Sequence, residues 1–360
     1  MIEQYTITTT PKYNFPQPTI DTTLPQRFLE QSIQSLKQVQ HQTFQLNQQT
    51  FQQFRSLEQQ PAKLRLKRQP ITLKPNHQET TIAAVDTSTI KIGETSTGII
   101  IAIRGATTWK QNRKYRYTRL GPFIFHITEE NKNEVYNTLE KAYFNTYFSS
   151  SRQASPHLMQ MPTRLASLLE RWLQTMLAKT VANGLILLDG SLTSGTFDTP
   201  VQRMKDILSL ARRNKSIVLA FSKMTSLRVN GYLITEHLPR HEPPYLIETS
   251  GLRFKPPTVV LGDVYVARLN KANYAFRLDI DRETPLQHRM GAVEKLLGND
   301  LHVQGYPETL RLSHILCTFT ANEVLAMKHF ITRKHGIQII NRPDMHRLLF
   351  GPFGKGETHS

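Results

Sequence analysis

Two stretches, TIAAVDTSTI over Thr81–Ile90 and GLILLDGSL over Gly184–Leu192, decide the fold of this chain. Each is an apolar run suited to a buried strand, and each carries one acid, Asp86 or Asp189, where the run gives way to Thr, Ser or Gly. Burying an unpaired carboxylate in an apolar strand is costly, because the charge loses its water. Two such acids are tolerated when they lie together at strand ends and share a cation. The two stretches therefore predict a metal site at the edge of a sheet.

The composition is that of a globular protein with an excess of positive charge. The 360 residues include 45 Lys and Arg against 28 Asp and Glu, which gives a formal net charge of +17. This excess indicates a polyanionic partner, nucleic acid before an anionic membrane surface, although a basic surface also serves solubility alone.

The single cysteine, Cys317, cannot form a disulfide within the chain, which fits a reducing cytoplasm. We expect Cys317 to be a small buried apolar side chain. No run reaches the roughly 18 apolar residues that span a bilayer, so no membrane segment is expected.

Three β-rich stretches joined by short turns open the main unit. They are Thr81–Ile90, Thr97–Trp109 and Tyr115–Thr128, and β-branched and aromatic residues dominate all three. Connections this short leave no room for crossover helices, so an antiparallel meander is expected.

Helices and strands alternate after the meander. Helices are expected at Asn133–Phe148, Met161–Ala182 and Pro200–Arg213, and strands at Gly184–Leu192 and Ser216–Met224. The first of these strands is apolar nearly throughout, as expected for a strand covered on both faces. The pattern β-β-β-α-β-α-β predicts an α/β fold of the ribonuclease H-like class. In this fold a mixed sheet, an antiparallel three-strand meander plus parallel strands, is flanked by helices.

The C-terminal half continues with a predicted hairpin and two helices. The hairpin joins Val259–Asn270 to Asn273–Ile280, and helices are expected at Pro285–Leu297 and from Pro307 to about Lys334.

The N-terminal region has a different composition. About the first 20 residues are expected to be irregular. The Gln-rich segment Pro25–Gln60 has a narrow apolar stripe typical of a long helix or helix pair that docks on another helix, including one of a second copy; a low-complexity arm is the alternative. The basic, Pro-punctuated stretch that follows is expected to be a linker near the polyanion. We therefore divide the chain into a helical arm and basic linker (1–80), a main domain (81–345) and a disordered tail (346–360).

The motifs of the main domain resemble those of the NurA nuclease family. In chain order they are Asp86 in the first strand, Glu170 on the helix, LLDGSL with Asp189, AFSKMTS with Lys223, VYVARL with FRLDI, and GYPETLRLSH with His314. The resemblance runs from about Thr81 to the helix after Tyr306. It departs from the family at Thr87, where a Gly usually follows the first acid.

The resemblance implies a manganese-dependent nuclease with a ribonuclease H-like core. It further implies a homodimer that resects DNA ends with a HerA-type hexameric translocase, and hence a role in double-strand break repair.

Phosphodiester hydrolysis needs an activated water and a stabilised leaving oxygen, and two divalent ions held by carboxylates supply both. The expected ions are Mn²⁺ or Mg²⁺. Asp86 is expected to bridge both ions, Asp189 to hold one from the neighbouring strand end, and Glu170 to reach in from its helix. His314 is expected to bind an ion or shuttle a proton, and Asp279 to add a further carboxylate.

Each of these residues also has a structural interpretation. Asp189 suits the turn that follows it. Glu170 lies at the edge of the apolar stripe of its helix, as a solvated acid would. His314 sits on a helix that is apolar nearly all round, where a buried histidine is usually a hydrogen-bonded core residue. Asp279 shares a strand face with Arg277, with which it could form an ion pair.

Basic and aromatic residues supply candidate contacts to nucleic acid. Lys223 ends the fifth predicted strand on the same edge as Asp189, where it could hold the scissile phosphate as a point charge. A basic hairpin tip with adjacent tyrosines fits single-strand binding. The remaining expected contacts are Lys110, Arg113, Lys114, Tyr265 and Arg268. No base-reading motif is present, so cleavage without sequence specificity is expected.

Two other classes of function stay open. An actin-like ATP-dependent phosphotransferase has the same opening meander and an early acid, but it needs Gly-rich phosphate turns and a second copy of the unit. Here the first Gly after Asp86 is Gly93, and no second unit follows. A non-catalytic nucleic-acid-binding scaffold would have no need to retain the acids.

Overall fold

The structure is a computed structural model, and its account covers only part of the chain. It describes residues 2–6, 23–37, 64–67, 69–144, 157–196, 199–236, 238–252, 254–337 and 339–340. The rest of the Gln-rich segment, the end of the predicted helix 133–148 and the C-terminal tail lie outside these residues.

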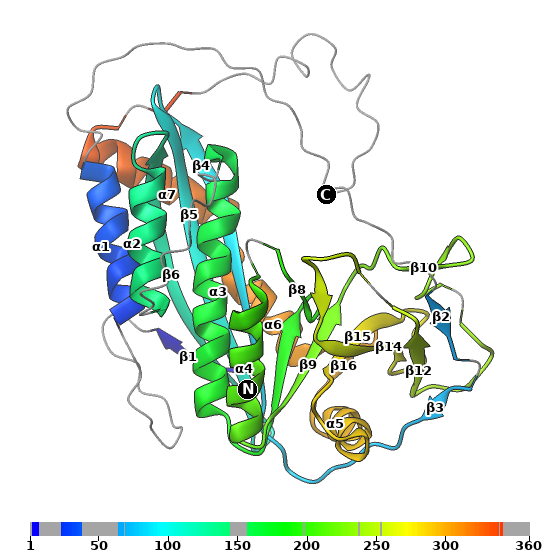
Figure 1. Ribbon diagram of the computed structural model, residues 1–360. Helices are drawn as coiled ribbons and strands as arrows, with labels where there is room; N and C mark the ends of the chain where they lie inside the picture. The colour runs from blue at the N-terminus through cyan, green and yellow to red at the C-terminus, as the bar shows by residue number, and fades with distance from the viewer. Residues whose placement is uncertain are drawn as a thin grey trace, which may run out of the picture.

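A mixed sheet of eleven strands is the framework of the described residues (Figure 1). Its order is β1-β6-β5-β4-β7-β9-β15-β14-β12-β2, and β3 also pairs with β12. The strands of this sheet are β1 (Ile2–Thr6), β2 (Arg65–Leu66), β3 (Ile71–Thr72), β4 (Ile82–Glu94), β5 (Gly98–Gln111), β6 (Lys114–Thr128), β7 (Leu185–Asp189), β9 (Ile217–Ser222), β12 (Tyr245–Ser250), β14 (Gly262–Arg268) and β15 (Phe276–Asp281).

Short strand pairs and helices complete the fold. The short pairs are β10 (Arg228–Val229) with β11 (Tyr232–Leu233), β13 (Val259–Val260) with β8 (Thr193–Ser194), and β16 (His302–Val303) with β17 (Tyr306–Pro307). The α-helices are α1 (Thr23–Lys37), α2 (Lys132–Phe144), α3 (Met161–Thr180), α4 (Val201–Arg213), α5 (Leu286–Asn299), α6 (Glu308–Cys317) and α7 (Ala321–His335). Among the described helices, none is both long and apolar enough to cross a membrane.

The predicted ribonuclease H-like class is confirmed by the strand pairing. β4, β5 and β6 form the antiparallel meander, and β7 pairs in parallel with β4 and with β9. The predicted hairpin after these strands is also present, because β14 and β15 pair antiparallel, and β15 joins the sheet at β9.

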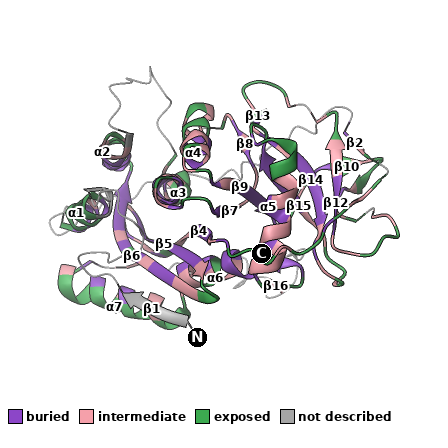
Figure 2. Ribbon diagram, turned by 90° about the horizontal axis from the view of Figure 1, so that it is seen from below, coloured by how far each residue is buried: buried purple, intermediate pink, exposed green. Residues whose placement is uncertain are grey.

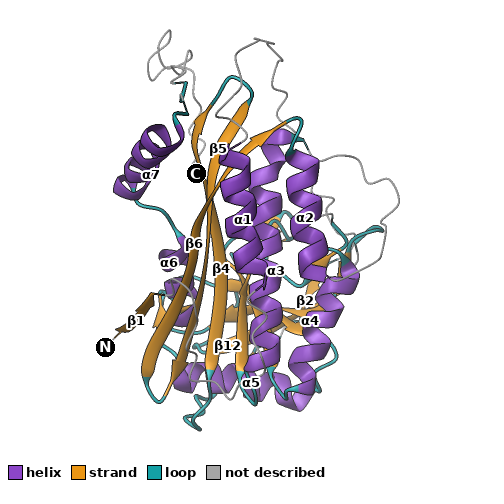
Figure 3. Ribbon diagram, turned by 90° about the vertical axis from the view of Figure 1, so that its left-hand side faces the viewer, coloured by secondary structure: helices purple, strands orange, loops and turns teal. Residues whose placement is uncertain are grey.

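Helices cover both faces of the sheet (Figure 3). α1, α2, α3 and α4 lie on one face, and α6 and α7 on the other. Along β4, Ala83 and Val85 belong to the core shared with α3, whereas Ile82 and Ala84 belong to the core shared with α5 and α6. Strands buried on both faces explain the nearly continuous apolar runs, and Figure 2 shows the buried strands between the two helix layers.

The N-terminal region is more ordered than its sequence predicts. Ile2–Thr6 form β1, which pairs in parallel with β6, so the expectation of an irregular start is wrong there. The expected linker supplies β2 and β3, which pair with β12, a strand that the sequence analysis missed. Strands of two residues carry too little pattern to reveal themselves, and backbone pairing rather than side-chain alternation defines them.

α1 packs within this chain through only part of its apolar side chains, Phe28 and Leu36. Phe28 is fully buried, and its ring centroid lies 5.4 Å from that of Phe123 and 5.8 Å from that of Phe125 on β6. Within this chain Thr23–Lys37 contacts β6 and α2, whereas Leu29 and Ile33 are exposed, so docking of this helix on a second copy stays a prediction.

The long helix expected from Pro307 is broken into α6 and α7. Thr320 begins α7 with a capping box, in which its hydroxyl accepts from the Glu323 N–H and the Glu323 side chain accepts from the Thr320 N–H. The Glu323 carboxylate also binds Arg104 at 2.8 Å and Arg119 at 3.2 Å, which fixes α7 to β5 and β6. Hydrogen bonds from Arg104 are the largest cause that lowers the pKa of Glu323 to about 2.

The stability of the meander is expected to depend on pH through His126. This side chain on β6 is 1% exposed, its Nε2 lies 2.8 Å from the Thr95 hydroxyl, and burial lowers its pKa to about 4. Between about pH 6.5 and pH 4, His126 is protonated in the unfolded chain, where its pKa is ordinary, but stays neutral in the folded chain. The free energy of unfolding should therefore fall by ~3 kcal/mol as the pH drops from about 6.5 to about 4.

Urea unfolding at pH 7.5 and pH 5, compared between the wild type and His126→Gln, measures this contribution. The variant should lose part of the pH dependence, because other titrating groups are common to both proteins. An equal change in the free energy of unfolding between pH 7.5 and pH 5 in the two proteins would contradict the lowered pKa of His126.

Candidate active site

Asp86 and Asp189 meet where β7 ends beside β4. The parallel pairing of the two strands ends with Val85 opposite Leu188, and the two acids follow directly. Neighbouring strands are about 4.8 Å apart, so the acids begin from adjacent backbone positions. Both continue the alternate positions that face α5 and α6, and their side-chain contacts lie on that face.

A glycine turn holds Asp189 at the end of β7. Gly190 has φ +110°, a conformation that favours glycine. The Gly190 N–H donates to the Phe221 carbonyl at 2.8 Å, and the Ser222 hydroxyl donates to the Gly190 carbonyl at 2.8 Å. The turn predicted as a structural role for Asp189 is therefore present. It follows Asp189 directly, so the carboxylate lies at the end of β7.

Asp86 is nearly buried and is bonded to His314. Its Oδ2 lies 2.7 Å from the Nδ1 of His314 on α6, and its Oδ1 accepts from the Thr87 N–H at 2.7 Å. Burial is the largest cause that raises the pKa of Asp86, and the charge of Asp189 raises it further; the bonds to His314 and Thr87 act in the opposite direction. Without a bound cation, the charged form of Asp86 is therefore less favoured than that of an exposed aspartate.

The expected burial of His314 is wrong. α6 packs on β4 and β5 through one side only, and the His314 side chain is 49% exposed. Leu310, Ser313 and Cys317 form the buried side of the helix. His314 therefore faces solvent while one ring nitrogen reaches Asp86.

Asp189 is paired with Lys223 and with a tyrosine. Lys223 follows β9, and its Nζ lies 2.6 Å from Asp189 Oδ2. The Tyr306 hydroxyl donates to Asp189 Oδ1 at 3.3 Å, and the Lys223 ammonium lies 5.7 Å from the centroid of the same ring. Burial, and then the Asp189 charge, raise the pKa of Tyr306, so this phenol stays a neutral donor.

Glu170 approaches from the other face of the sheet. It lies on α3, where the Gln174 amide donates to its Oε1 at 2.7 Å. Burial is the largest cause that raises its pKa; Arg171 lowers it, and the charges of Asp86 and Asp189 raise it again. The carboxylate is therefore within electrostatic range of both strand acids.

Asp279 is not part of this cluster. It alternates onto the opposite face of β15, is fully buried, and binds Arg277 through both oxygens at 2.7 Å. Its Oδ2 also accepts from the Leu192 N–H at 2.9 Å. These contacts match the structural interpretation, an ion pair with Arg277, and leave Asp279 out of the proposed ligand set.

Two of the expected nucleic-acid contacts have other roles. The expected contact through Tyr265 is wrong, because its side chain is 1% exposed and belongs to the core against α5 and α6. Arg268, at the end of β14, donates from Nε to the Ala272 carbonyl at 3.3 Å.

The basic hairpin tip lies far from the acids. Lys110 pairs with Ile82, four residues before Asp86, so the tip with Arg113 and Lys114 begins about 13 Å along the strands. The neighbouring Tyr115 hydroxyl donates to Asp300 at 2.6 Å, and the Lys110 ammonium lies 4.9 Å from the centroid of the Tyr115 ring.

Tyr306 and Cys317 also lie at the site, although the sequence predicts no role for either of them there. Tyr306 lies within the GYPETLRLSH motif, and Cys317 follows His314 by three residues, the spacing that places two side chains on one helix face. The motif around Tyr306 and the spacing of Cys317 from His314 are the sequence features that could have indicated a place in the site. The expected burial of Cys317 is confirmed, at 0% exposure.

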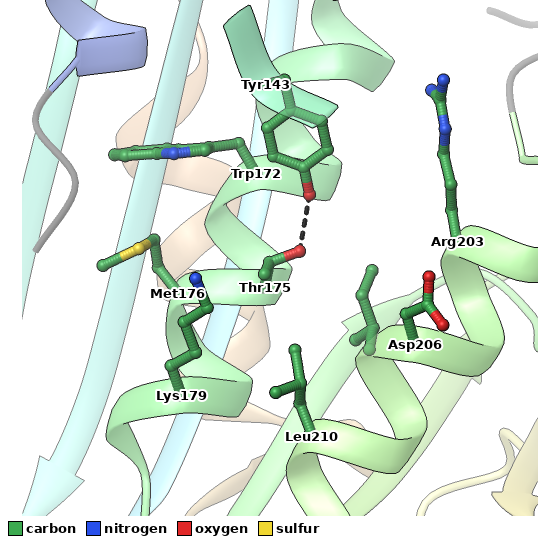
Figure 4. A pocket seen from close by; sticks show the side chains of 9 residues that line it. Tyr143, Trp172, Thr175, Met176, Lys179, Arg203, Asp206 and Leu210 are labelled. Atoms are coloured by element: carbon green, nitrogen blue, oxygen red, sulfur yellow. Dashed lines mark hydrogen bonds between the residues drawn. The ribbon is translucent and has the colours of Figure 1, made fainter. Parts of the chain in front are cut away.

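A separate pocket of about 170 Å³ lies between α2, α3 and α4 (Figure 4). Trp172, Met176 and Lys179 line it from α3, and the Tyr143 hydroxyl lies 2.5 Å from the Thr175 hydroxyl at its edge. These α3 residues share a helix face that is turned away from Glu170. The pocket is therefore separate from the acid cluster.

The acid cluster fits a divalent cation. Asp86 and Asp189 lie side by side on β4 and β7, and Glu170 on α3 is within electrostatic range of both. Burial, and then the charge of Asp189, raise the pKa of Asp86, whereas burial and the charges of both strand acids raise that of Glu170. Carboxylate oxygens are the ligands that Mg²⁺ and Mn²⁺ prefer, and imidazole is an accepted addition. Asp86, Asp189, Glu170 and His314 are the residues that could hold such an ion.

Comparison with solved structures finds nucleases among the similar folds. NurA nuclease from Sulfolobus solfataricus is 14% identical, with a TM-score of 0.44, over 74% of this chain and 88% of its own. Endonuclease V from Bacillus subtilis is 12% identical, with a TM-score of 0.33, over 73% of this chain and 86% of its own. The C-terminal lobe of a budding yeast Argonaute is 10% identical, with a TM-score of 0.27, over 69% and 48%. No family model matches the sequence, and no curated protein sequence matches it.

Proposed function

We propose that this protein is a metal-dependent deoxyribonuclease that hydrolyses phosphodiester bonds without sequence specificity. The convergence of Asp86, Asp189 and Glu170 at the end of β7 is the observation that carries the proposal. The charge of Asp189 raises the pKa of Asp86, and the charges of both raise the pKa of Glu170, effects that a cation bound between them would offset. The net charge of +17 supports a polyanionic substrate.

Each residue has a distinct part in the proposed reaction. The site would hold two Mn²⁺ or Mg²⁺ ions. Their proposed ligands are Asp86, Asp189, Glu170 and His314. The bound ions supply an activated water and stabilise the leaving oxygen. Lys223 is 39% exposed and reaches Asp189, so its ammonium can turn to a substrate phosphate. Tyr306 keeps Asp189 oriented by donating to it.

The biological setting is part of the same proposal. The motif resemblance supports DNA end resection in double-strand break repair, a HerA-type translocase as partner and a homodimer. The single cysteine supports a cytoplasmic location. Gel filtration of the full chain, alone and with such a translocase, tests the two assemblies.

A cleavage assay on the purified full chain tests the chemistry. Labelled linear single- and double-stranded DNA is incubated with Mn²⁺, Mg²⁺ or EDTA, with and without ATP. We expect degradation with Mn²⁺ or Mg²⁺, none with EDTA, and no requirement for ATP. Hydrolysis of ATP without cleavage would favour the phosphotransferase class, and DNA binding without either reaction would favour the scaffold.

A further inference from the structure

A thiol lies among the candidate ligands of the active site. Asp86, His314 and Cys317 each offer one ligand atom, and these atoms lie within 4.8 Å of one another. His314 and Cys317 lie about one turn apart on α6, and Asp86 comes from β4, on which that helix packs. The Cys317 Sγ also lies 3.2 Å from the His314 carbonyl oxygen.

The chemistry of this trio differs from that of the carboxylate cluster. Carboxylate oxygens suit hard ions such as Mn²⁺ and Mg²⁺, whereas a thiolate favours Zn²⁺. One oxygen, one nitrogen and one sulfur are three ligands of the kinds found around zinc, which leaves a fourth position for water.

We propose that Asp86, His314 and Cys317 form a Zn²⁺ site that shares two residues with the Mn²⁺ or Mg²⁺ site. On binding, a zinc–sulfur bond forms and the Cys317 thiol proton passes to solvent. The hydrogen bond between Asp86 and His314 opens, and its proton moves to Nε2 of His314 if Nδ1 carried it, or to solvent if Asp86 carried it. Oδ2 of Asp86 and Nδ1 of His314 then each offer an electron pair to the zinc.

The distances are compatible with this rearrangement. Ligand atoms bound to one tetrahedral zinc are separated by roughly 3–4 Å. The bonded pair of Asp86 Oδ2 and His314 Nδ1, at 2.7 Å, must move apart slightly, and the sulfur must approach. Burial, and then the charge of Asp86, raise the pKa of Cys317, so without an ion the thiol stays protonated.

A regulatory consequence follows, and this part rests on the proposed nuclease function. Because Asp86 and His314 serve both sites, zinc and the catalytic ions exclude one another. Zn²⁺ is therefore an inhibitor that competes with Mn²⁺.

Cobalt spectroscopy on the metal-free full chain tests the site directly. Co²⁺ replaces Zn²⁺ with the same ligands, and a cobalt–thiolate bond gives a charge-transfer absorption in the near ultraviolet. The sequence contains one cysteine, so any such band is assigned to Cys317 without ambiguity. We expect the band in the wild type, its loss on addition of excess Zn²⁺, and its absence in Cys317→Ser.

Zinc affinity gives a second measurement. In competition with a chromophoric chelator, Cys317→Ser should bind Zn²⁺ at least about 10-fold more weakly than the wild type. A wild-type spectrum without the thiolate band overturns the proposal, whether or not the variant folds. Neither measurement uses DNA, so failure of the zinc site and failure of the nuclease assignment are separate results.

Discussion

Replacing Asp86 with Asn is expected to abolish cleavage while making the metal-free protein more stable. Asn keeps the shape of the side chain but is a poor ligand for a hard cation. The rate should fall by about 10³-fold or more, a loss of about 4 kcal/mol of transition-state stabilisation. The raised pKa of Asp86 means that the folded state favours the neutral carboxyl, so a neutral amide removes a cost at pH 7.

The cleavage rate and the stability, measured together, distinguish a metal ligand from a residue needed only for folding. Thermal unfolding with and without Mn²⁺ should show stabilisation of the wild type by the ion and little or none for Asp86→Asn. Asp206→Asn is the matched control, because Asp206 is exposed on α4 and its carboxylate accepts a hydrogen bond from the Gln202 side chain. Cleavage by Asp86→Asn at the wild-type rate would reject the proposed role of the acid.

Replacing Asp279 with Ala is expected to destabilise the fold severely without removing a metal ligand. The change leaves the Arg277 guanidinium, 6% exposed, without its buried counter-ion, and it leaves the Leu192 N–H without its acceptor. Removing one partner of a buried ion pair costs about 3–5 kcal/mol. Chemical unfolding at pH 7 measures the loss.

The control for this variant is an exposed ion pair elsewhere on the sheet. Glu248 binds Lys67 at 2.7 Å with both side chains at least one-third exposed, so Glu248→Ala should cost less than about 1 kcal/mol. The folded fraction of Asp279→Ala should still gain stability from Mn²⁺. Loss of that gain together with unchanged stability would make Asp279 a ligand after all.

The framework of the fold could be predicted because its elements are long and strongly patterned. The meander, the two parallel strands and the helices between them follow from runs of apolar residues whose lengths match real elements. The pairing that brings Asp86 beside Asp189 follows from the parallel arrangement of the two strands. The expectation that both acids lie at strand ends is wrong for Asp86, because β4 continues to Glu94.

The parts that could not be predicted depend on long-range contacts. β2 and β3 are defined by pairing with β12, and the break before α7 depends on capping at Thr320 rather than on hydropathy. Tyr265 carries a hydroxyl suited to a ligand contact, but only the packing of α5 over β14 decides that its ring is buried.

The side-chain contacts within the site were the hardest feature to predict from the sequence. The sequence placed Lys223 on the correct edge, but its ion pair with Asp189 depends on side-chain positions. His314 was expected in the core, because a helix that is apolar nearly all round gives no sign of which side faces the sheet.

The meander extends well past the acids. β4 runs eight residues beyond Asp86, about 26 Å, with β5 alongside over most of that length. This distance corresponds to roughly eight base steps of B-form DNA. A polymer that leaves the acids in this direction would run beside folded protein instead of entering open solvent, so contacts remote from the scissile bond are available to hold it.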